Sequence, residues 1–196
     1  MFSDYSEEYY QKGIKYIEAG DYDKAVEVLS KSAELGNREA FTALGSACAE
    51  ACDYEMAYKW YTEGLYAGSI QATFNLGQMY FEGEYVDQDY KKALEYFLLA
   101  YQNGFEYASY YLGAYAEYGY GDYEIDYEEA VEWYENGVWW KDTSSLVALG
   151  RCYELGHGVA MDKEKALQLY EQAANLGDEE GIRALIYIRN VEGMQS

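Results

Sequence analysis

Apolar and small residues recur along the chain at four-residue spacings, each time starting from an aspartate. Each aspartate is followed four positions later by an alanine and eight positions later by a leucine or an aromatic residue. Positions four and eight residues apart share one face of an α-helix. An aspartate directly before such a stretch is typical of a helix N-cap, because its carboxylate accepts hydrogen bonds from the free N–H groups of the first turn. The three columns are Asp21, Asp53, Asp89, Asp126 and Asp162; Ala25, Ala57, Ala93, Ala130 and Ala166; and Leu29, Tyr61, Phe97, Tyr134 and Tyr170. Asp126 and Glu129 are also spaced as a capping box.

Two glycine columns complete the repeat. The first lies in the helix that precedes each aspartate, and a leucine stands before the glycine from the second repeat on. Since glycine in a helix interior costs about 1 kcal/mol, we expect its missing Cβ to let two helices approach closely. This column is Gly13, Gly45, Gly77, Gly113 and Gly150, with Leu44, Leu76, Leu112 and Leu149. The second column is Gly36, Gly68, Gly104 and Gly177, interrupted at Trp140–Lys141, and it is expected to close each second helix in the left-handed conformation. Asn37, Ser69 and Asp178 then follow as N-caps.

The pattern predicts five helix-turn-helix repeats and a C-terminal capping helix within a single repeat domain, 1–196. The repeats span about 4–36, 37–68, 69–104, 105–141 and 142–177, with the cap at 178–196. First helices are expected at 4–19, 38–51, 70–82, 106–118 and 143–155, and second helices at 22–35, 54–67, 90–103, 127–139 and 163–176. In the capping helix, 179–191, we expect Leu185 and Ile186 to cover the edge of the fifth repeat.

Two segments carry a family resemblance. LGQMYFEGEYVDQDYKKALEYFLLAYQNG (76–104) and LGRCYELGHGVAMDKEKALQLYEQAANLG (149–177) resemble the Sel1-like repeat (SLR), a relative of the tetratricopeptide repeat. The first two repeats lack the extra loop and look like plain tetratricopeptide repeats. The resemblance implies an all-α, right-handed α/α solenoid superhelix. It also implies a non-enzymatic adaptor whose first helices line a concave face that binds proteins or peptides.

The net charge of the chain restricts the classes of partner that it is expected to bind. Thirty-six acidic and 14 basic residues among 196 give a formal net charge of −22. Nucleic-acid binding through phosphate contacts needs many Lys and Arg side chains, so no nucleic-acid partner is expected. An anionic membrane surface is disfavoured for the same reason, and no 18-residue apolar run is present to span a bilayer. The acidic start of the chain lacks the features of a signal peptide, which favours a cytoplasmic protein. Three cysteines are expected to be reduced.

No catalytic or metal-binding constellation is evident, and neither cofactor nor metal is expected. His157 is the single histidine, lies between two glycines, and is interpreted as a loop residue. Cys48 and Cys52 are spaced to share a helix face and are interpreted as small buried hydrophobic residues, because zinc needs four ligands of the Cys/His type. An enzyme is therefore disfavoured.

The 26 tyrosines suggest a contact surface, since tyrosine combines a large area with few rotatable bonds. By the family pattern, non-core positions of the first helices are predicted to bind a partner: Tyr10, Phe74, Gln78, Phe81, Tyr110, Tyr111, Glu117, Tyr118 and Arg151. The alternative is that most of these tyrosines are ordinary packing between helices. Segment 117–135 holds eight acids and no base. It is either a solvated face that aids solubility or a docking surface for a basic partner.

Two hypotheses about the function are consistent with these sequence features. The first is a protein-interaction adaptor or scaffold that binds a protein or peptide on its concave, tyrosine-rich acidic surface. The alternative is an inhibitor, such as an immunity or anti-defence protein, that neutralises a basic toxin or nuclease. The net charge and the acidic stretch motivate the second hypothesis.

Overall fold

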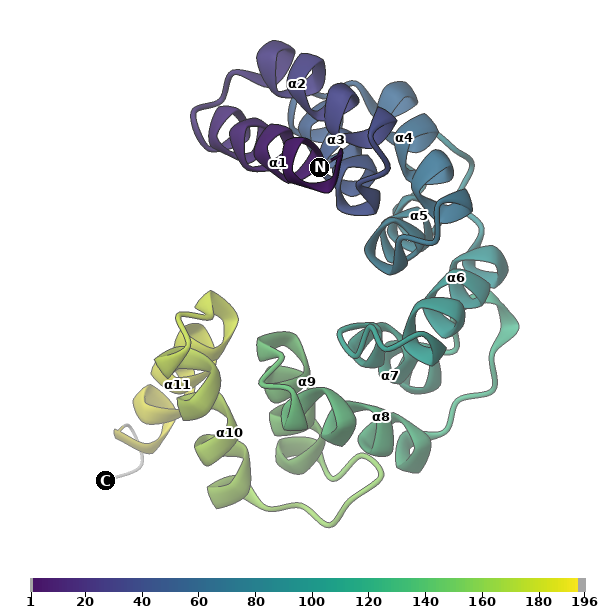
Figure 1. Ribbon diagram of the computed structural model, residues 1–196. Helices are drawn as coiled ribbons and strands as arrows, with labels where there is room; N and C mark the ends of the chain where they lie inside the picture. Colours follow the sequence, from purple (N-terminus) through teal and green to yellow (C-terminus); the bar gives the residue numbers. More distant parts are fainter. Residues whose placement is uncertain (1, 194–196) are drawn as a thin grey trace. The chain divides into compact units, whose positions relative to one another are not determined.

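The computed structural model describes residues 2–193, which form two compact units that meet in the sequence between Phe105 and Glu106 (Figure 1). Over the described residues there are eleven α-helices, one short 3-10 helix and no β-strand, which confirms the all-α prediction. Unit 1 contains α1 (Phe2–Glu18), α2 (Tyr22–Glu34), α3 (Arg38–Glu50), α4 (Tyr54–Tyr66), α5 (Ile70–Glu82) and α6 (Tyr90–Gln102). Unit 2 contains α7 (Ala108–Tyr118), η1 (Tyr120–Asp122), α8 (Tyr127–Trp139), α9 (Thr143–Leu155), α10 (Lys163–Asn175) and α11 (Glu179–Gly193).

The five aspartates begin the second helices as predicted. Asp89 Oδ1 accepts from the backbone N–H of Lys92 at 3.0 Å, and Asp162 Oδ1 accepts from that of Lys165 at 2.9 Å. Asp21, Asp53 and Asp126 cap α2, α4 and α8 in the same way. Each such cap stabilises its helix by about 1 kcal/mol. The aspartate column therefore sets where every second helix starts.

The capping box predicted at Asp126 and Glu129 is wrong. The Asp126 carboxylate caps α8, but its own N–H donates to the carbonyl oxygen of Ala116 at 2.9 Å rather than to Glu129. Glu129 Oε1 instead accepts from the Tyr123 hydroxyl at 2.9 Å and from the Trp133 indole N–H at 3.2 Å. The eight-residue loop before α8 folds back onto α7 and satisfies the donor that a capping box would have used.

The first glycine column marks the closest approach of paired helices. A Cβ on Gly77 would lie 2.8 Å from the Phe97 ring, and one on Gly150 would lie 2.7 Å from the Tyr170 ring. Gly13, Gly45 and Gly113 face Leu29, Tyr61 and Tyr134 in the same way. The leucines before these glycines and the alanines of the second helices are buried. Each repeat therefore packs one large side chain of its second helix onto a glycine of its first.

The second glycine column closes the second helices as predicted. Gly36, Gly68, Gly104 and Gly177 have φ between 80° and 91°. In the fourth repeat Lys141 takes this conformation, with φ 59°.

Cys52 has φ 60° and follows α3 instead of lying on it, so the prediction that it shares a helix face with Cys48 and is buried is wrong. It lies in the turn between α3 and α4, where its side chain is exposed.

The last helix packs on the fifth repeat along one face. Ala184, Leu185 and Ile188 contact the core of unit 2, which confirms the role predicted for Leu185. Ile186 is 55% exposed and is not among the side chains packed on that core, so the prediction that it covers the fifth repeat is wrong. Among the helices of the described residues, none combines the length and the apolarity that crossing a membrane requires.

Candidate functional site

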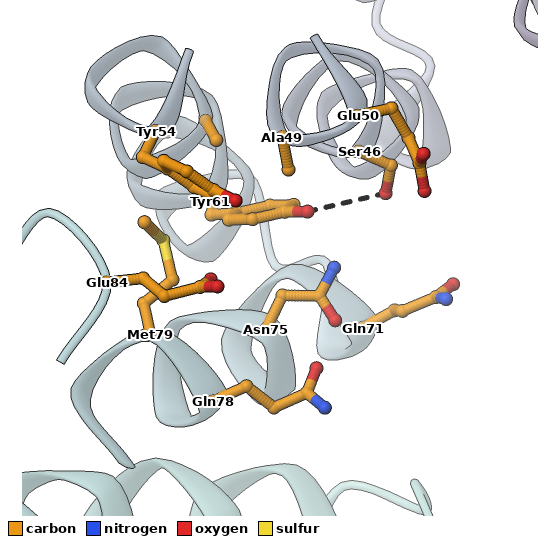
Figure 2. A pocket seen from close by; sticks show the side chains of 11 residues that line it. Ser46, Ala49, Glu50, Tyr54, Tyr61, Gln71, Asn75, Gln78, Met79 and Glu84 are labelled. Atoms are coloured by element: carbon orange, nitrogen blue, oxygen red, sulfur yellow. Dashed lines mark hydrogen bonds between the residues drawn. The ribbon is translucent and has the colours of Figure 1, made fainter. Parts of the chain in front are cut away.

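A hollow in unit 1 lies between α3, α4 and α5, and we call it the α3–α5 hollow (Figure 2). It encloses about 680 Å³, including its open mouth. Its lining residues are Ser46, Ala49, Glu50, Tyr54, Ala57, Tyr61, Gln71, Asn75, Gln78, Met79 and Glu84. The first helices of the second and third repeats form two of its walls, so its geometry follows from the register of neighbouring repeats.

The floor of the hollow is apolar. Tyr61 and Met79, which are 6% and 3% exposed, line it with ring and thioether groups, and the methyl group of Ala57 is fully buried. The Tyr61 ring packs directly on Gly45, where any larger residue would collide with the ring. An apolar floor of this kind can cover the aliphatic part of a ligand side chain.

Polar side chains surround this floor. The Tyr61 and Ser46 hydroxyl oxygens are 3.4 Å apart, within hydrogen-bonding distance. Asn75 faces the same hydroxyl from α5 (Figure 2). Burial raises the pKa of Tyr61, and the Glu84 carboxylate adds to this increase, so the hydroxyl stays protonated at neutral pH and can donate.

Two carboxylates stand at the edge of the hollow. Glu50 is the last residue of α3, and Glu84 belongs to the loop after α5. Both are exposed, and within the described part of the chain neither forms an ion pair. The hollow thus combines neutral donors and acceptors with two negative charges that have no counter-charge.

A buried polar cluster connects α7, α8 and α9 in unit 2. Glu117 Oε2 accepts from the Tyr134 hydroxyl at 2.7 Å and from the Arg151 guanidinium at 3.0 Å. The Glu117 side chain is 3% exposed and that of Arg151 is 33% exposed. Burial together with the nearby Glu117 carboxylate raises the pKa of Tyr134. The Arg151 guanidinium also lies 5.7 Å from the centre of the Tyr118 ring, within reach of a cation–π interaction.

The predicted binding residues are distributed over several places. Gln78 lines the α3–α5 hollow, whereas Tyr110 and Arg151 line a smaller depression in unit 2, together with Asp178 and Glu180. Tyr10 packs against the core of the first repeat. Phe81 contacts the Tyr90 and Phe97 rings, and Tyr111 contacts the Tyr110 ring. Tyr118 remains 46% exposed.

Two of these residues were wrongly placed at non-core positions. Phe74 is 8% exposed because the Phe97 and Phe105 rings pack on it, with centroids 5.5 and 4.8 Å away. Glu117 is buried because Arg151 and Tyr134 supply its hydrogen bonds. In both cases the partner comes from another helix, so the periodicity of the first helix alone does not reveal the burial.

Sequence reasoning missed most of the hollow. Ser46 directly follows the first-column glycine, as Gln78 and Arg151 do in their own repeats. That shared register would have identified Ser46 as an equivalent of the predicted Gln78. Gln71 and Asn75 precede Gly77 on the same helix, but they are not aromatic and were not considered.

The other side chains that could be chemically reactive, the histidine and two of the cysteines, take part in packing. The His157 ring stacks on Tyr127, with centroids 4.5 Å apart, so the loop that carries it is anchored to α8. Cys48 and Cys152 are buried, and burial raises the pKa of their thiols to about 11 and about 12. Within the part of the chain that the structure describes, no three His, Cys, Asp or Glu side chains are grouped to hold a metal ion.

Helix pairs that are capped by aspartate, closed by glycine and packed on a helix glycine define a repeat protein of the α/α solenoid class. The family model for the Sel1 repeat matches residues 4–37, 45–69, 70–105, 106–136 and 143–178. The chain therefore belongs to the Sel1 repeat family, as its resemblance to the SLR pattern indicated. Proteins with Sel1 repeats generally mediate protein–protein interactions, and the family is a non-enzymatic scaffold type.

Solved structures confirm the predicted fold class. A Sel1 repeat protein from Oxalobacter formigenes is 28% identical, with a TM-score of 0.77 over 89% of this chain and 73% of that one. A protective antigen of uropathogenic Escherichia coli with an SLR fold is 26% identical, with a TM-score of 0.75 over 94% of this chain and 41% of that one. A sel1-like repeat-containing protein of Acanthamoeba polyphaga mimivirus is 39% identical over 57 residues, which are 29% of this chain and 10% of that protein.

Proposed function

We propose that this protein is a non-enzymatic adaptor that binds an extended segment of a partner protein on the faces of its first helices. The α3–α5 hollow is the main contact in this proposal. The observation that carries it is the composition of that hollow, where an apolar floor is surrounded by hydroxyl and amide side chains from two neighbouring first helices.

Side chains of this kind suit an extended peptide. Asn75, Gln71 and Gln78 each offer both a donor and an acceptor, as the backbone of a peptide also does. They all come from α5 and follow one another along the helix, so they can hydrogen bond to successive residues of a bound segment. The apolar floor then accepts one side chain of that segment, which supplies specificity.

The exposed aromatic surface of unit 2 is proposed as a further contact. Tyr118 is partly exposed, and the Arg151–Glu117 ion pair fixes the position of the guanidinium beneath it. Because Glu117 is buried, its part in this proposal is to hold Arg151 and Tyr134 in place rather than to touch the partner.

Affinity capture from extracts of the native cell, followed by mass spectrometry, tests the proposal. The variant Gln71→Arg/Gln78→Arg fills the mouth of the hollow with two long charged side chains. Gln102→Arg/Gln172→Arg is the matched control, because it makes the same chemical change at exposed positions of α6 and α10. We expect the unmodified protein and the control to retain the same partner and the hollow variant to lose it, while circular dichroism stays helical for all three. Retention of that partner by the hollow variant would contradict the proposal.

A further inference from the structure

We propose that the α3–α5 hollow recognises a basic side chain, arginine or lysine, of the bound segment. This inference rests on the proposed function and adds the chemistry of the residue that enters the hollow. Three features of the hollow carry it: uncompensated negative charge, an apolar floor beside two aromatic rings, and acceptors at the edge.

The charge of the hollow fits a cation. Glu50 and Glu84 lie on either side of it (Figure 2), and no Lys, Arg or His is among its described lining residues. Glu50 is also the last residue of α3, where the carbonyl end of the helix carries partial negative charge. A bound guanidinium or ammonium group would therefore meet two carboxylates and a helix C-terminus. An acidic or phosphorylated side chain would be repelled by the same groups.

The floor of the hollow fits the stem of a basic side chain. The partly buried Ala49, together with the 3% of Met79 that is exposed, presents apolar surface on which the methylene groups of arginine or lysine can pack while the charged head stays in a polar environment. Tyr54 and Tyr61 add ring surface along one wall (Figure 2). A cation close to such rings gains a cation–π interaction.

The neutral groups of the hollow complete the recognition. The Ser46 hydroxyl and the side-chain carbonyl of Asn75 are acceptors, in addition to the two carboxylates. These acceptors come from α3 and α5 and are spread around the hollow, whereas a guanidinium carries five N–H donors in a planar fork. Arginine can therefore use several of them at once.

Titration of the 15N-labelled protein with three small probes tests the inference by NMR. The probes are the Nα-acetyl amides of arginine, lysine and citrulline, the last of which has nearly the shape of arginine but no charge. We expect arginine or lysine amide to shift the signals of Ser46, Asn75, Gln78 and Glu84 with millimolar affinity. Citrulline amide should bind about tenfold more weakly, because it cannot form charge-assisted hydrogen bonds with the carboxylates. Equal affinity for citrulline and arginine amides, or no shift at the hollow, would overturn the inference.

A matched pair of variants separates the hollow from the general charge of the protein. Glu50→Gln/Glu84→Gln removes both carboxylates of the hollow, and Glu55→Gln/Glu63→Gln removes two exposed carboxylates of α4. The first variant should lose about tenfold in affinity for arginine amide, and the second should stay within about twofold, since exposed charges at a distance are screened by salt. Equal losses in the two variants would show a non-specific charge effect and refute the site.

Together, the probe titration and the capture experiment distinguish a failure of this inference from a failure of the proposed function. Should the probes fail to bind while Gln71→Arg/Gln78→Arg still abolishes partner capture, the adaptor function stands and the basic-residue specificity is wrong. Should the probes bind as expected while capture is unaffected by that variant, the site exists and the adaptor function is wrong.

Discussion

Replacing Glu117 with glutamine removes one negative charge from the buried cluster of unit 2 while nearly preserving the size of the side chain. In the native protein a single oxygen of Glu117 accepts from the Tyr134 hydroxyl and from the Arg151 guanidinium. Glutamine keeps an acceptor for both donors, but neither hydrogen bond is then made to a carboxylate. The substitution therefore isolates the contribution of the charge.

The expected cost follows from the burial of the partners. A hydrogen bond to a charged group stabilises by about 1.5–3 kcal/mol and a neutral one by about 0.5–1.5 kcal/mol, so each of the two bonds loses about 1–1.5 kcal/mol. The Arg151 side chain is 33% exposed, so water recovers part of that loss. We expect Glu117→Gln to lower the free energy of unfolding of unit 2 by about 2 kcal/mol.

Urea denaturation followed by tryptophan fluorescence measures this cost. Trp60 is the one tryptophan of unit 1, so in a Trp60→Phe background the signal comes from Trp133, Trp139 and Trp140 of unit 2. Glu132→Gln is the control, because this carboxylate is exposed on α8 and its loss should change stability by less than about 0.5 kcal/mol.

A double-mutant cycle with Arg151→Met tests whether the Glu117–Arg151 ion pair stabilises the cluster. Alone, Arg151→Met leaves Glu117 buried without its cation and should cost about 3 kcal/mol. In the Glu117→Gln background it should cost only about 1 kcal/mol, which gives a coupling energy of about 2 kcal/mol. A coupling below about 0.5 kcal/mol would show that the ion pair contributes little and that the cluster is held by packing alone.

Four further predictions concern the thiols, the turn after α3, alkaline pH and the last helix. Iodoacetamide at pH 8 should modify Cys52 in the native protein and leave Cys48 and Cys152 unmodified, as peptide mass spectrometry can show; rapid modification of all three would contradict their burial. Cys52→Gly should raise the free energy of unfolding by about 1 kcal/mol, because glycine adopts φ 60° without strain, and a loss in urea denaturation would refute this. Burial raises the pKa of both buried thiols above the unfolded value of 9.0, so their contribution to the free energy of unfolding is complete below pH 9 and is lost toward pH 11–12. Melting temperatures that are unchanged between pH 8 and pH 11 would contradict this prediction. Deleting 179–196 should lower the melting temperature of unit 2 because Leu185 packs on its core, and an unchanged melt would show that α11 adds no stability.

The fold could be predicted from local signals that recur in every repeat. An aspartate cap acts within three residues, and a glycine such as Gly77 or Gly150 reports a contact inside one helix pair. These signals fixed helix starts and pairing without knowledge of distant contacts. The capping box at Asp126 failed because the donor it needed is used by Ala116 of the preceding helix.

The site depended more on contacts between repeats. Gln78 was predicted, but the identity of its neighbours in the hollow depends on how α3 and α5 face each other. Phe74 and Glu117 occupy first-helix positions that the family pattern placed outside the core, and both are buried by side chains from later in the chain. Asn75, which was not among the predicted residues, lines the hollow, whereas Phe74 next to it on α5 is buried.

Photo-crosslinking in the native cell tests the central claim most directly. Benzoylphenylalanine is placed either at Gln71, at the mouth of the α3–α5 hollow, or at Gln102, an exposed position of α6. We expect a crosslink from position 71 to a partner segment that contains arginine or lysine, and none to that partner from position 102. A partner that crosslinks from position 102 and not from position 71 would contradict it.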